Sequence, residues 1–378
     1  MSRHRSVGER MAISKHNLNI QVLRAIAAFL VVVGHSVHET EAISAVVGRP
    51  AVDLSFVYWG FGVDIFFVIS GFIMVYTSVD LFGRPGAWRI FLARRLTRIV
   101  PLYWLLTTAL LIGALLAPRL LNVPIGDWQH VLASYLFIPS FRIPGEIRPV
   151  MALGWTLNME MFFYVLFAGA LFLPLRKGIA ALALVLVGLA IVGIVFRPEQ
   201  VLLAFWTQSI ILEFLFGCLL AVAYLNGARL TAPVAIAMGA LGFAGMLRIP
   251  GFDGQILLPD ALRWGIPALL IVAAAALLHS ESTSSRMTLW LVALGDASYS
   301  LYLAHPFILR PFRNLWISLV GGAVPLAAYV AVAALVATFG SILVYRWVER
   351  PLLRWLQART RAPSAPPRHV PNQAPALP

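Results

Sequence analysis

Two ionisable side chains stand inside the first apolar stretch of the sequence, where a charge is costly. Arg24 and His35 are eleven residues apart in a predicted helix over 18–38. At about 100° per residue, this spacing puts both side chains on one face, about 16 Å apart along the axis. A cation at one depth and a general base at another suit a substrate that enters from one side and reacts further in. We therefore expect the pair to line one internal cavity, although a snorkelling arginine and a hydrogen-bonded histidine would be the structural alternative.

A second basic group, Arg94, Arg95 and Arg98, comes directly before the apolar stretch 99–117. Spacings of three and four residues put Arg98 on the same helical face as the other two. Guanidinium groups match phosphate oxygens, so this face could bind the phosphates of a nucleotide-like donor. Contact with lipid headgroups and topology setting explain the same cluster equally well.

Carboxylates occur in two further apolar stretches. Glu160 follows Trp155 in the segment Gly154-Trp-Thr-Leu-Asn-Met-Glu160. Its carboxylate could orient a base or bind sugar hydroxyls, and the indole ring could stack on a sugar. The alternative is an interfacial tryptophan beside a glutamate paired with an arginine of another helix. Asp64, in the apolar segment 62–71, is open to the same two interpretations.

Ser298 and His305 are seven residues apart and therefore share a helical face, with Asp296 close by. A serine nucleophile with its base would fit this spacing, but the Gly-x-Ser-x-Gly turn is absent, so we favour a hydrogen-bonded helix contact. The sequence also has no Gly-rich phosphate loop and no cysteine pair, and His35-x-x-His38-Glu39 has the wrong order for a zinc protease helix. It therefore supports no metal site.

The amino-acid composition indicates which type of fold positions these side chains. Of the 378 residues, 60% are hydrophobic and only 12% are charged, about half the usual share for a soluble domain. Several apolar runs reach the ~20 residues that span a bilayer. We predict an all-α polytopic membrane protein with about ten transmembrane helices in one bundle. Their predicted ranges are 18–38, 56–79, 99–117, 149–173, 178–196, 204–225, 232–247, 261–279, 288–309 and 324–346.

Charge distribution predicts the orientation. The net charge is +13, and most of the 29 Lys and Arg residues fall on one side when both termini are placed in the cytoplasm. This agrees with the positive-inside rule and predicts a multi-pass protein of the inner (plasma) membrane. The predicted parts are a cytoplasmic N-terminal segment (1–17), a membrane domain (18–355) and a disordered cytoplasmic tail (356–378) that is rich in Pro, Ala and Arg.

Six motifs, in order, resemble acyltransferase family 3, the bacterial membrane acyltransferases that modify surface and secreted polysaccharides. They are Arg24-x10-His35, Arg95-x-x-Arg98, the segment 62–71, Trp155-Thr-Leu-Asn-Met-Glu160, Tyr299-Ser-Leu-Tyr302-Leu-Ala-His305 and Glu349-Arg350-Pro351. The resemblance covers about Leu18 to Arg354. The opening segment from Asn19 resembles the subgroup that acetylates exopolysaccharides.

This resemblance implies an O-acyltransferase that moves an acyl group, most often acetyl, from cytoplasmic acyl-CoA to a sugar hydroxyl. The acceptor would be an exopolysaccharide or a lipid-linked oligosaccharide, with polysaccharide synthesis machinery as a further partner. It implies no tightly bound cofactor, no metal and no nucleic acid. The implied catalytic residues are His35 (base or transient acyl carrier), Arg24 and Glu160, and the implied donor-binding residues are Arg95 and Arg98. Substrate-binding or structural roles fall to Asp64, Trp155, Tyr302, His305 and Glu349.

Two other classes of protein fit the same sequence features. A transporter of glycans or lipids would also carry buried charges on many helices. A non-catalytic subunit of a polysaccharide synthesis or export complex would have the same composition. The first predicts transport without acyl transfer, and the second predicts that His35→Ala leaves glycan acetylation intact.

Overall fold

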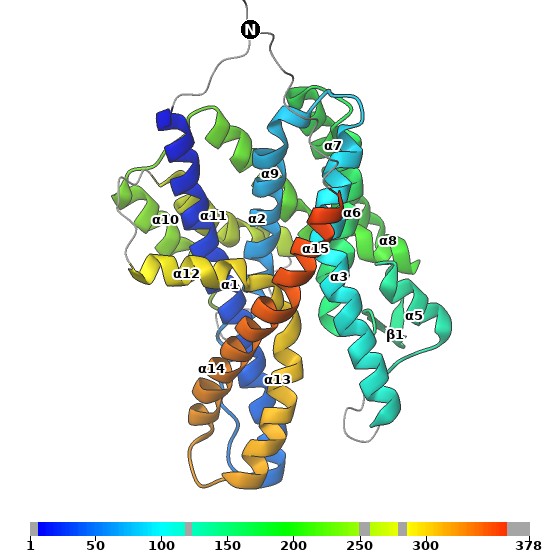
Figure 1. The fold of residues 1–378 in the computed structure, drawn as a ribbon, viewed down its shortest axis with the longest axis vertical. Coiled ribbons are helices and arrows are strands. Elements are labelled where there is room, and N and C mark those ends of the chain that lie inside the picture. The colour runs from blue at the N-terminus through cyan, green and yellow to red at the C-terminus, as the bar shows by residue number, and fades with distance from the viewer. Residues whose placement is uncertain (1–6, 118–122, 249–257, 279–285, 361–378) are drawn as a thin grey trace, which may run out of the picture.

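The computed structural model describes residues 7–117, 123–248, 258–278 and 286–360, which are predominantly helical (Figure 1). Five helices are long and apolar enough to cross a membrane: Leu18–Val47, Phe61–Leu81, Ala87–Leu116, Leu175–Phe196 and Leu326–Ala358. Three shorter apolar helices are Ser209–Leu225, Ala232–Gly245 and Ala261–Leu277. A helical membrane protein is therefore confirmed, whereas the count of about ten spans stays a prediction.

The elements follow one another in a largely helical order. The helices are α1 (Val7–Val47), α2 (Phe61–Ser78), α3 (Ala87–Leu116), α5 (Trp128–Tyr135), α6 (Trp155–Ala170), α7 (Leu175–Phe196), α8 (Val201–Trp206), α9 (Leu212–Leu225), α10 (Ala232–Gly245), α11 (Ile266–Leu277), α12 (Arg286–Asp296), α13 (Ser298–Leu319), α14 (Leu326–Val344) and α15 (Arg350–Thr360). Short turns of 3₁₀ or π helix are Val79–Leu81, Ala152–Gly154, Ser209–Ile211, Ala261–Gly265 and Tyr345–Glu349. A small antiparallel hairpin, β1 (Phe141–Ile143) and β2 (Glu146–Ile147), is the one sheet in the described ranges and departs from the all-α prediction.

Helices α2 and α9 cross at a pair of glycines in the middle of the bundle. A Cβ atom on Gly71 would lie 2.0 Å from the carbonyl oxygen of Phe214, and one on Gly217 would lie 1.9 Å from that of Val68. Only glycine permits backbones to approach this closely within a helix pair. The crossing fixes α2, and with it Ser70, against the aromatic core formed by α2, α6 and α9.

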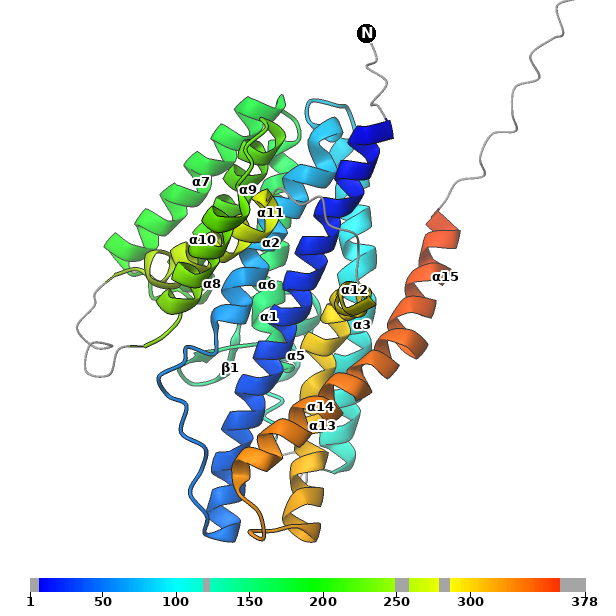
Figure 2. The same ribbon diagram turned by 90° about the vertical axis from the view of Figure 1, so that its left-hand side faces the viewer.

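A second, smaller core joins α1, α13 and α14. Its fully buried members include Val32, Leu309 and Tyr329. Helix α1 runs along most of the molecule and lies beside α13, as Figures 1 and 2 show. This packing turns the face of α1 that carries Arg24 and His35 toward α13 and α2.

The predicted single span 288–309 is wrong, because the chain turns at Ala297 and forms two helices. Helix α12 lies across α1, whereas α13 runs alongside α1 (Figures 1 and 2). A Cβ on Gly295 would lie 2.0 Å from the carbonyl oxygen of Gln21, so glycine allows this close crossing. Met287 and Trp290 are exposed on α12.

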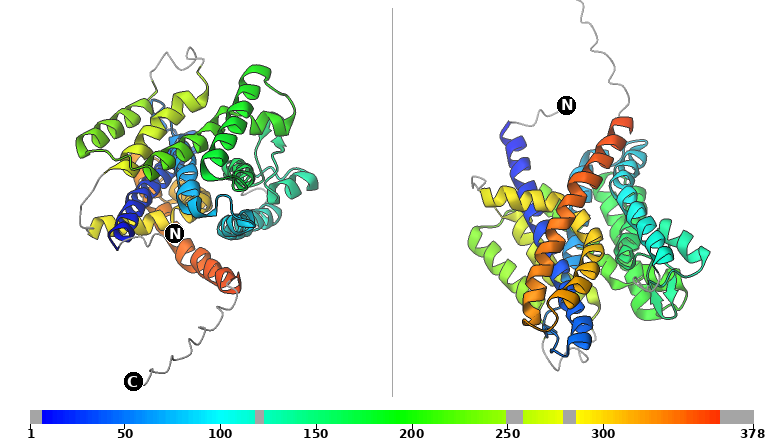
Figure 3. Two further views of the ribbon diagram at one scale, coloured as in Figure 1. Left: turned by 90° about the horizontal axis from the view of Figure 1, so that it is seen from above. Right: turned by 60° about the horizontal axis from the view of Figure 1, so that its bottom comes forward.

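The ends of the described chain lie toward the same end of the molecule (Figure 2). Helix α1 begins at Val7, within the predicted N-terminal segment, and α15 continues to Thr360, five residues into the predicted tail. Residues 1–6 and 361–378 lie outside the described ranges. A π turn over Tyr345–Glu349 separates α14 from α15, which leans away from the bundle (Figure 3).

Candidate functional site

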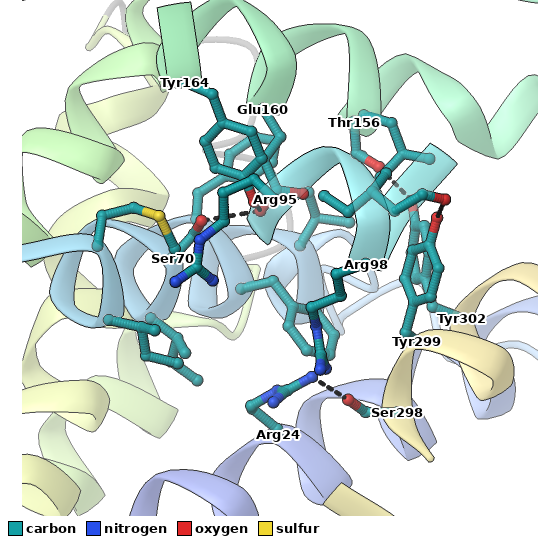
Figure 4. Close-up of a pocket in the computed structure, with 18 of the residues that line it drawn as sticks. Arg24, Ser70, Arg95, Arg98, Thr156, Glu160, Tyr164, Ser298, Tyr299 and Tyr302 are labelled. Atoms are coloured by element: carbon teal, nitrogen blue, oxygen red, sulfur yellow. Dashed lines mark hydrogen bonds between the residues drawn. The ribbon is translucent and has the colours of Figure 1, made fainter. Parts of the chain in front are cut away.

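A cavity of about 350 Å³ lies among α1, α2, α3, α6 and α13, and its polar side chains come from all five helices (Figure 4). Four of the predicted catalytic or donor-binding residues line it: Arg24, Arg95, Arg98 and Glu160. Tyr302 lines it as well. The structure thus brings together residues that lie nearly 280 positions apart in the chain.

Arg24 is held at the cavity wall by two hydrogen bonds. Its guanidinium donates to Gln21 Oε1 (3.1 Å) on α1 and to Ser298 Oγ (2.9 Å) on α13. The Gln21 amide in turn donates to Asp296 Oδ1 (3.0 Å). These contacts fix the guanidinium while leaving several of its five N–H donors free for a ligand.

The two arginines of α3 enter the cavity from the opposite wall, and their guanidinium groups point into the same space as that of Arg24 (Figure 4). Arg95 donates to Thr77 Oγ1 (3.1 Å) and its Nε is buried without a partner. Arg98 makes no hydrogen bond to another residue of the described ranges. Arg94, the third member of the predicted cluster, is exposed and does not line the cavity.

Among the described residues, Glu160 carries the one carboxylate that lines the cavity. Its Oε1 accepts a hydrogen bond from Ser70 Oγ (2.8 Å) and another from the Tyr164 hydroxyl. Within the described ranges it forms no ion pair with any of the three arginines. The cavity therefore holds more cationic than anionic side chains in a membrane-embedded setting, where an uncompensated charge is costly unless a ligand completes it.

His35 does not line this cavity, so the prediction that it shares one cavity with Arg24 is wrong. Its Nδ1 lies 2.9 Å from the carbonyl oxygen of Val31. Because a carbonyl only accepts, Nδ1 carries the proton and Nε2 keeps a free lone pair. The ring meets the edge of His305 at a centroid distance of 4.8 Å. The two residues share a face of α1, as their helical spacing predicts, but the imidazole of His35 is partly exposed and lies outside the cavity that Arg24 lines.

His305 is completely buried on α13. Its Nδ1 lies 2.9 Å from the carbonyl oxygen of Leu301, and its Nε2 has no hydrogen-bond partner in the described ranges. It forms no hydrogen bond with Ser298, which instead accepts from Arg24. The preference for a helix contact over a serine nucleophile agrees with this arrangement.

Three predicted residues lie away from the cavity. Asp64 is completely buried on α2 beside Glu213 of α9. The ring of Trp155 meets that of Phe67 edge to face. The guanidinium carbon of Arg148 lies over the Trp155 ring, 5.9 Å from the ring centroid. Glu349 is buried in the π turn before α15.

Glu349 accepts a hydrogen bond from Ser300 of α13 through one carboxylate oxygen. Its other oxygen is buried without a partner among the described residues. Ser300 is two positions from Ser298, so Glu349 contacts the helix that anchors Arg24 rather than the cavity itself. This geometry is that of a supporting residue.

Sequence reasoning missed several cavity residues. Gln21 lies three positions before Arg24, and Tyr164 lies four positions after Glu160, so helical spacing could have identified both. Ser70 reaches Glu160 from another helix, ninety positions away. Nothing in the local sequence indicates that contact.

Comparison with known proteins agrees with this membrane-embedded site. The acyltransferase domain model of the acyltransferase 3 family matches residues 17–346. The exopolysaccharide production protein ExoZ of Rhizobium meliloti (strain 1021) is 38% identical over 303 residues, which cover 79% of this chain and 90% of the relative. No solved structure matches the chain.

A more distant relative is the O-acetyltransferase OatA of Staphylococcus aureus (strain NCTC 8325 / PS 47). It is 24% identical over 322 residues, which cover 77% of this chain but 52% of the relative, so the match spans about half the length of OatA. The fold and the family match together define a membrane acyltransferase. This chain belongs to the acyltransferase 3 family.

Proposed function

We propose that the protein is an O-acyltransferase of the bacterial inner membrane that transfers an acetyl group from cytoplasmic acetyl-CoA to a sugar hydroxyl of an exopolysaccharide. The names of ExoZ and OatA support polysaccharide as the acceptor class and acetyl as the acyl group. The common end of α1 and α15 agrees with both termini lying on one side of the membrane, and the positive-inside rule favours the cytoplasm as that side.

The excess of guanidinium groups in the cavity carries this proposal. Arg24, Arg95 and Arg98 point into one space and form no ion pair within the described ranges. Phosphate oxygens accept several N–H bonds from such groups in charge-assisted contacts. A donor that carries phosphates, such as acyl-CoA, would satisfy these cations, whereas a neutral sugar would not.

The proposed reaction uses the free Nε2 lone pair of His35. The acceptor hydroxyl gives its proton to Nε2 while its oxygen attacks the thioester carbonyl carbon. Negative charge develops on the carbonyl oxygen, and a fixed guanidinium stabilises it in a site of low dielectric. The carbon–sulfur bond then breaks, and the thiolate of CoA takes the proton from the imidazole. Transfer through an acylated His35 would use the same nitrogen.

The test is release of free CoA from acetyl-CoA by protein reconstituted in lipid nanodiscs with the acceptor glycan. Loss of one charge-assisted contact costs about 1.5–3 kcal/mol, so Arg95→Ala and Arg98→Ala should each raise the Kd for acetyl-CoA by roughly ten- to a hundredfold. Arg94→Ala is the matched control, because Arg94 is exposed on the same helix and lies outside the cavity.

Each alternative predicts a different result. A transporter would move glycan or lipid without CoA release by the folded protein. A non-catalytic subunit would leave cellular glycan acetylation unchanged in Arg24→Ala cells, although deletion of the chain abolishes it. Equal acetyl-CoA affinity of Arg98→Ala and the parent protein would contradict the donor site.

A further inference from the structure

The aromatic ring of Tyr302 borders the arginine-lined cavity and also contacts the ring of His305. Tyr302 and Phe66 both line the cavity, and their rings meet edge to face at 6.2 Å. The ring of Tyr302 also meets that of His305 at 6.5 Å, and His305 meets His35 at 4.8 Å. Neither histidine lines the cavity.

Tyr302 is fixed in this position from two sides. Its hydroxyl lies 3.0 Å from Thr156 Oγ1 and donates to the carbonyl oxygen of Leu153 at 3.2 Å. The side chain is 7% exposed. The ring is therefore packed and hydrogen-bonded where the cavity wall meets His305.

The backbone below Tyr302 lacks one helical hydrogen bond. Pro306, which lies inside α13, has no N–H to donate to the carbonyl of Tyr302 four positions earlier. A small displacement of this turn therefore breaks fewer hydrogen bonds than it would elsewhere in the helix. Such a displacement would open a passage, and the volume of the Tyr302 and Phe66 rings would limit its width.

We infer that Tyr302 and Phe66 form a partition between the donor cavity and His35 that limits the length of the acyl chain able to reach His35 while it is still joined to the CoA sulfur, so that these two rings set the acyl-chain specificity. This inference rests on the proposed function. In the reaction that it constrains, the acceptor oxygen forms the ester bond, the thioester carbon–sulfur bond breaks, and the hydroxyl proton passes through His35 to the CoA thiolate. A two-carbon acyl group needs little displacement of the rings, whereas each added methylene must occupy space that they fill.

The test compares acetyl-CoA with hexanoyl-CoA as donors for the parent protein, Tyr302→Leu and Phe66→Leu, all in nanodiscs with the same acceptor. The readout is the ratio of kcat/KM for hexanoyl-CoA to that for acetyl-CoA, which does not depend on the fraction of active protein. We expect this ratio to rise about tenfold or more in Tyr302→Leu, the range that a few methylenes are worth in an apolar pocket. Phe66→Leu should raise it less, because the change from phenylalanine to leucine removes less volume than the change from tyrosine to leucine.

Tyr302→Phe separates the ring from its hydroxyl. It keeps the ring volume, so it should preserve the preference for acetyl-CoA while it loses the contacts to Thr156 and Leu153. An unchanged ratio in both leucine variants, or loss of all turnover in both monodisperse variants, would overturn the partition. Absence of thioester cleavage by the parent protein would instead overturn the proposed function, and this inference with it.

Discussion

Arg24 and His35 lie on one face of α1 but differ in their hydrogen-bond partners and in their surroundings. At Arg24, the guanidinium has two hydrogen-bond partners and borders a cavity with two further arginines. At His35, the imidazole is packed against His305 and has one partner, a carbonyl oxygen of its own helix. The first end borders a preformed cavity, whereas the second is partly exposed and lies outside that cavity.

This difference separates binding from chemistry along a single helix. A preformed cationic site can hold a phosphate-bearing donor in the ground state. A base outside that cavity can act only after the thioester end of the donor reaches it. Substitutions at the two ends should therefore change different measured quantities, and three predictions follow from that contrast.

The largest effect is expected for His35→Ala. Loss of a general base lowers turnover by about 10²- to 10⁴-fold, while the affinity for acetyl-CoA should stay within about twofold because His35 lies outside the cavity. The measurements are CoA release and equilibrium binding of acetyl-CoA. His38→Ala is the matched control, since that side chain is 74% exposed one turn further along the same helix. Normal turnover by His35→Ala would remove the base from the mechanism.

A smaller effect, on both binding and turnover, is expected for Arg24→Ala. Removal of one charge-assisted contact should weaken acetyl-CoA binding by roughly ten- to a hundredfold. Arg24→Lys keeps the charge but loses the planar fork, so it should recover only part of the affinity. Isothermal titration or ligand-induced thermal shift measures both variants. If lysine restored full affinity, charge rather than fork geometry would define the site.

The smallest effect is expected for Ser298→Ala. The Ser298 hydroxyl orients Arg24 but carries no charge. A hydrogen bond to a charged group contributes about 1.5–3 kcal/mol at most, and a water molecule that replaces the hydroxyl restores part of this energy. Donor affinity should fall by several-fold, with no change in the preference for acetyl-CoA. Ser318→Ala, which removes an exposed serine of the same helix, is the control. A loss as large as that of Arg24→Ala would show that Ser298 contacts the ligand.

Helical periodicity predicted much of the site. It placed Arg24 and His35 on one face of α1, and Arg95 and Arg98 on one face of α3, because residues at these spacings project together in any α-helix. It could not show whether the two α1 residues reach the same cavity. That depends on how α13, a helix far along the chain, packs against α1.

The fold was predicted less completely. Apolar length located the long helices, but α12 is apolar and still lies across α1, since Gly295 lets the two backbones touch. Hydropathy does not distinguish a helix that spans the bilayer from one that lies across its neighbour. The contact between Ser70 and Glu160 likewise depends on tertiary packing.

The glycine contact between α2 and α9 has a consequence for how substrates enter and leave. With the backbone at Gly71 and Gly217 in direct contact, neither lipid nor water can separate these helices, and they should move as one rigid unit. Exchange of a donor or an acceptor must then come from displacement of α1, α3, α6 or α13 relative to that unit. A cross-link between α2 and α9 should consequently leave turnover intact, while one between α2 and α13 should stop it.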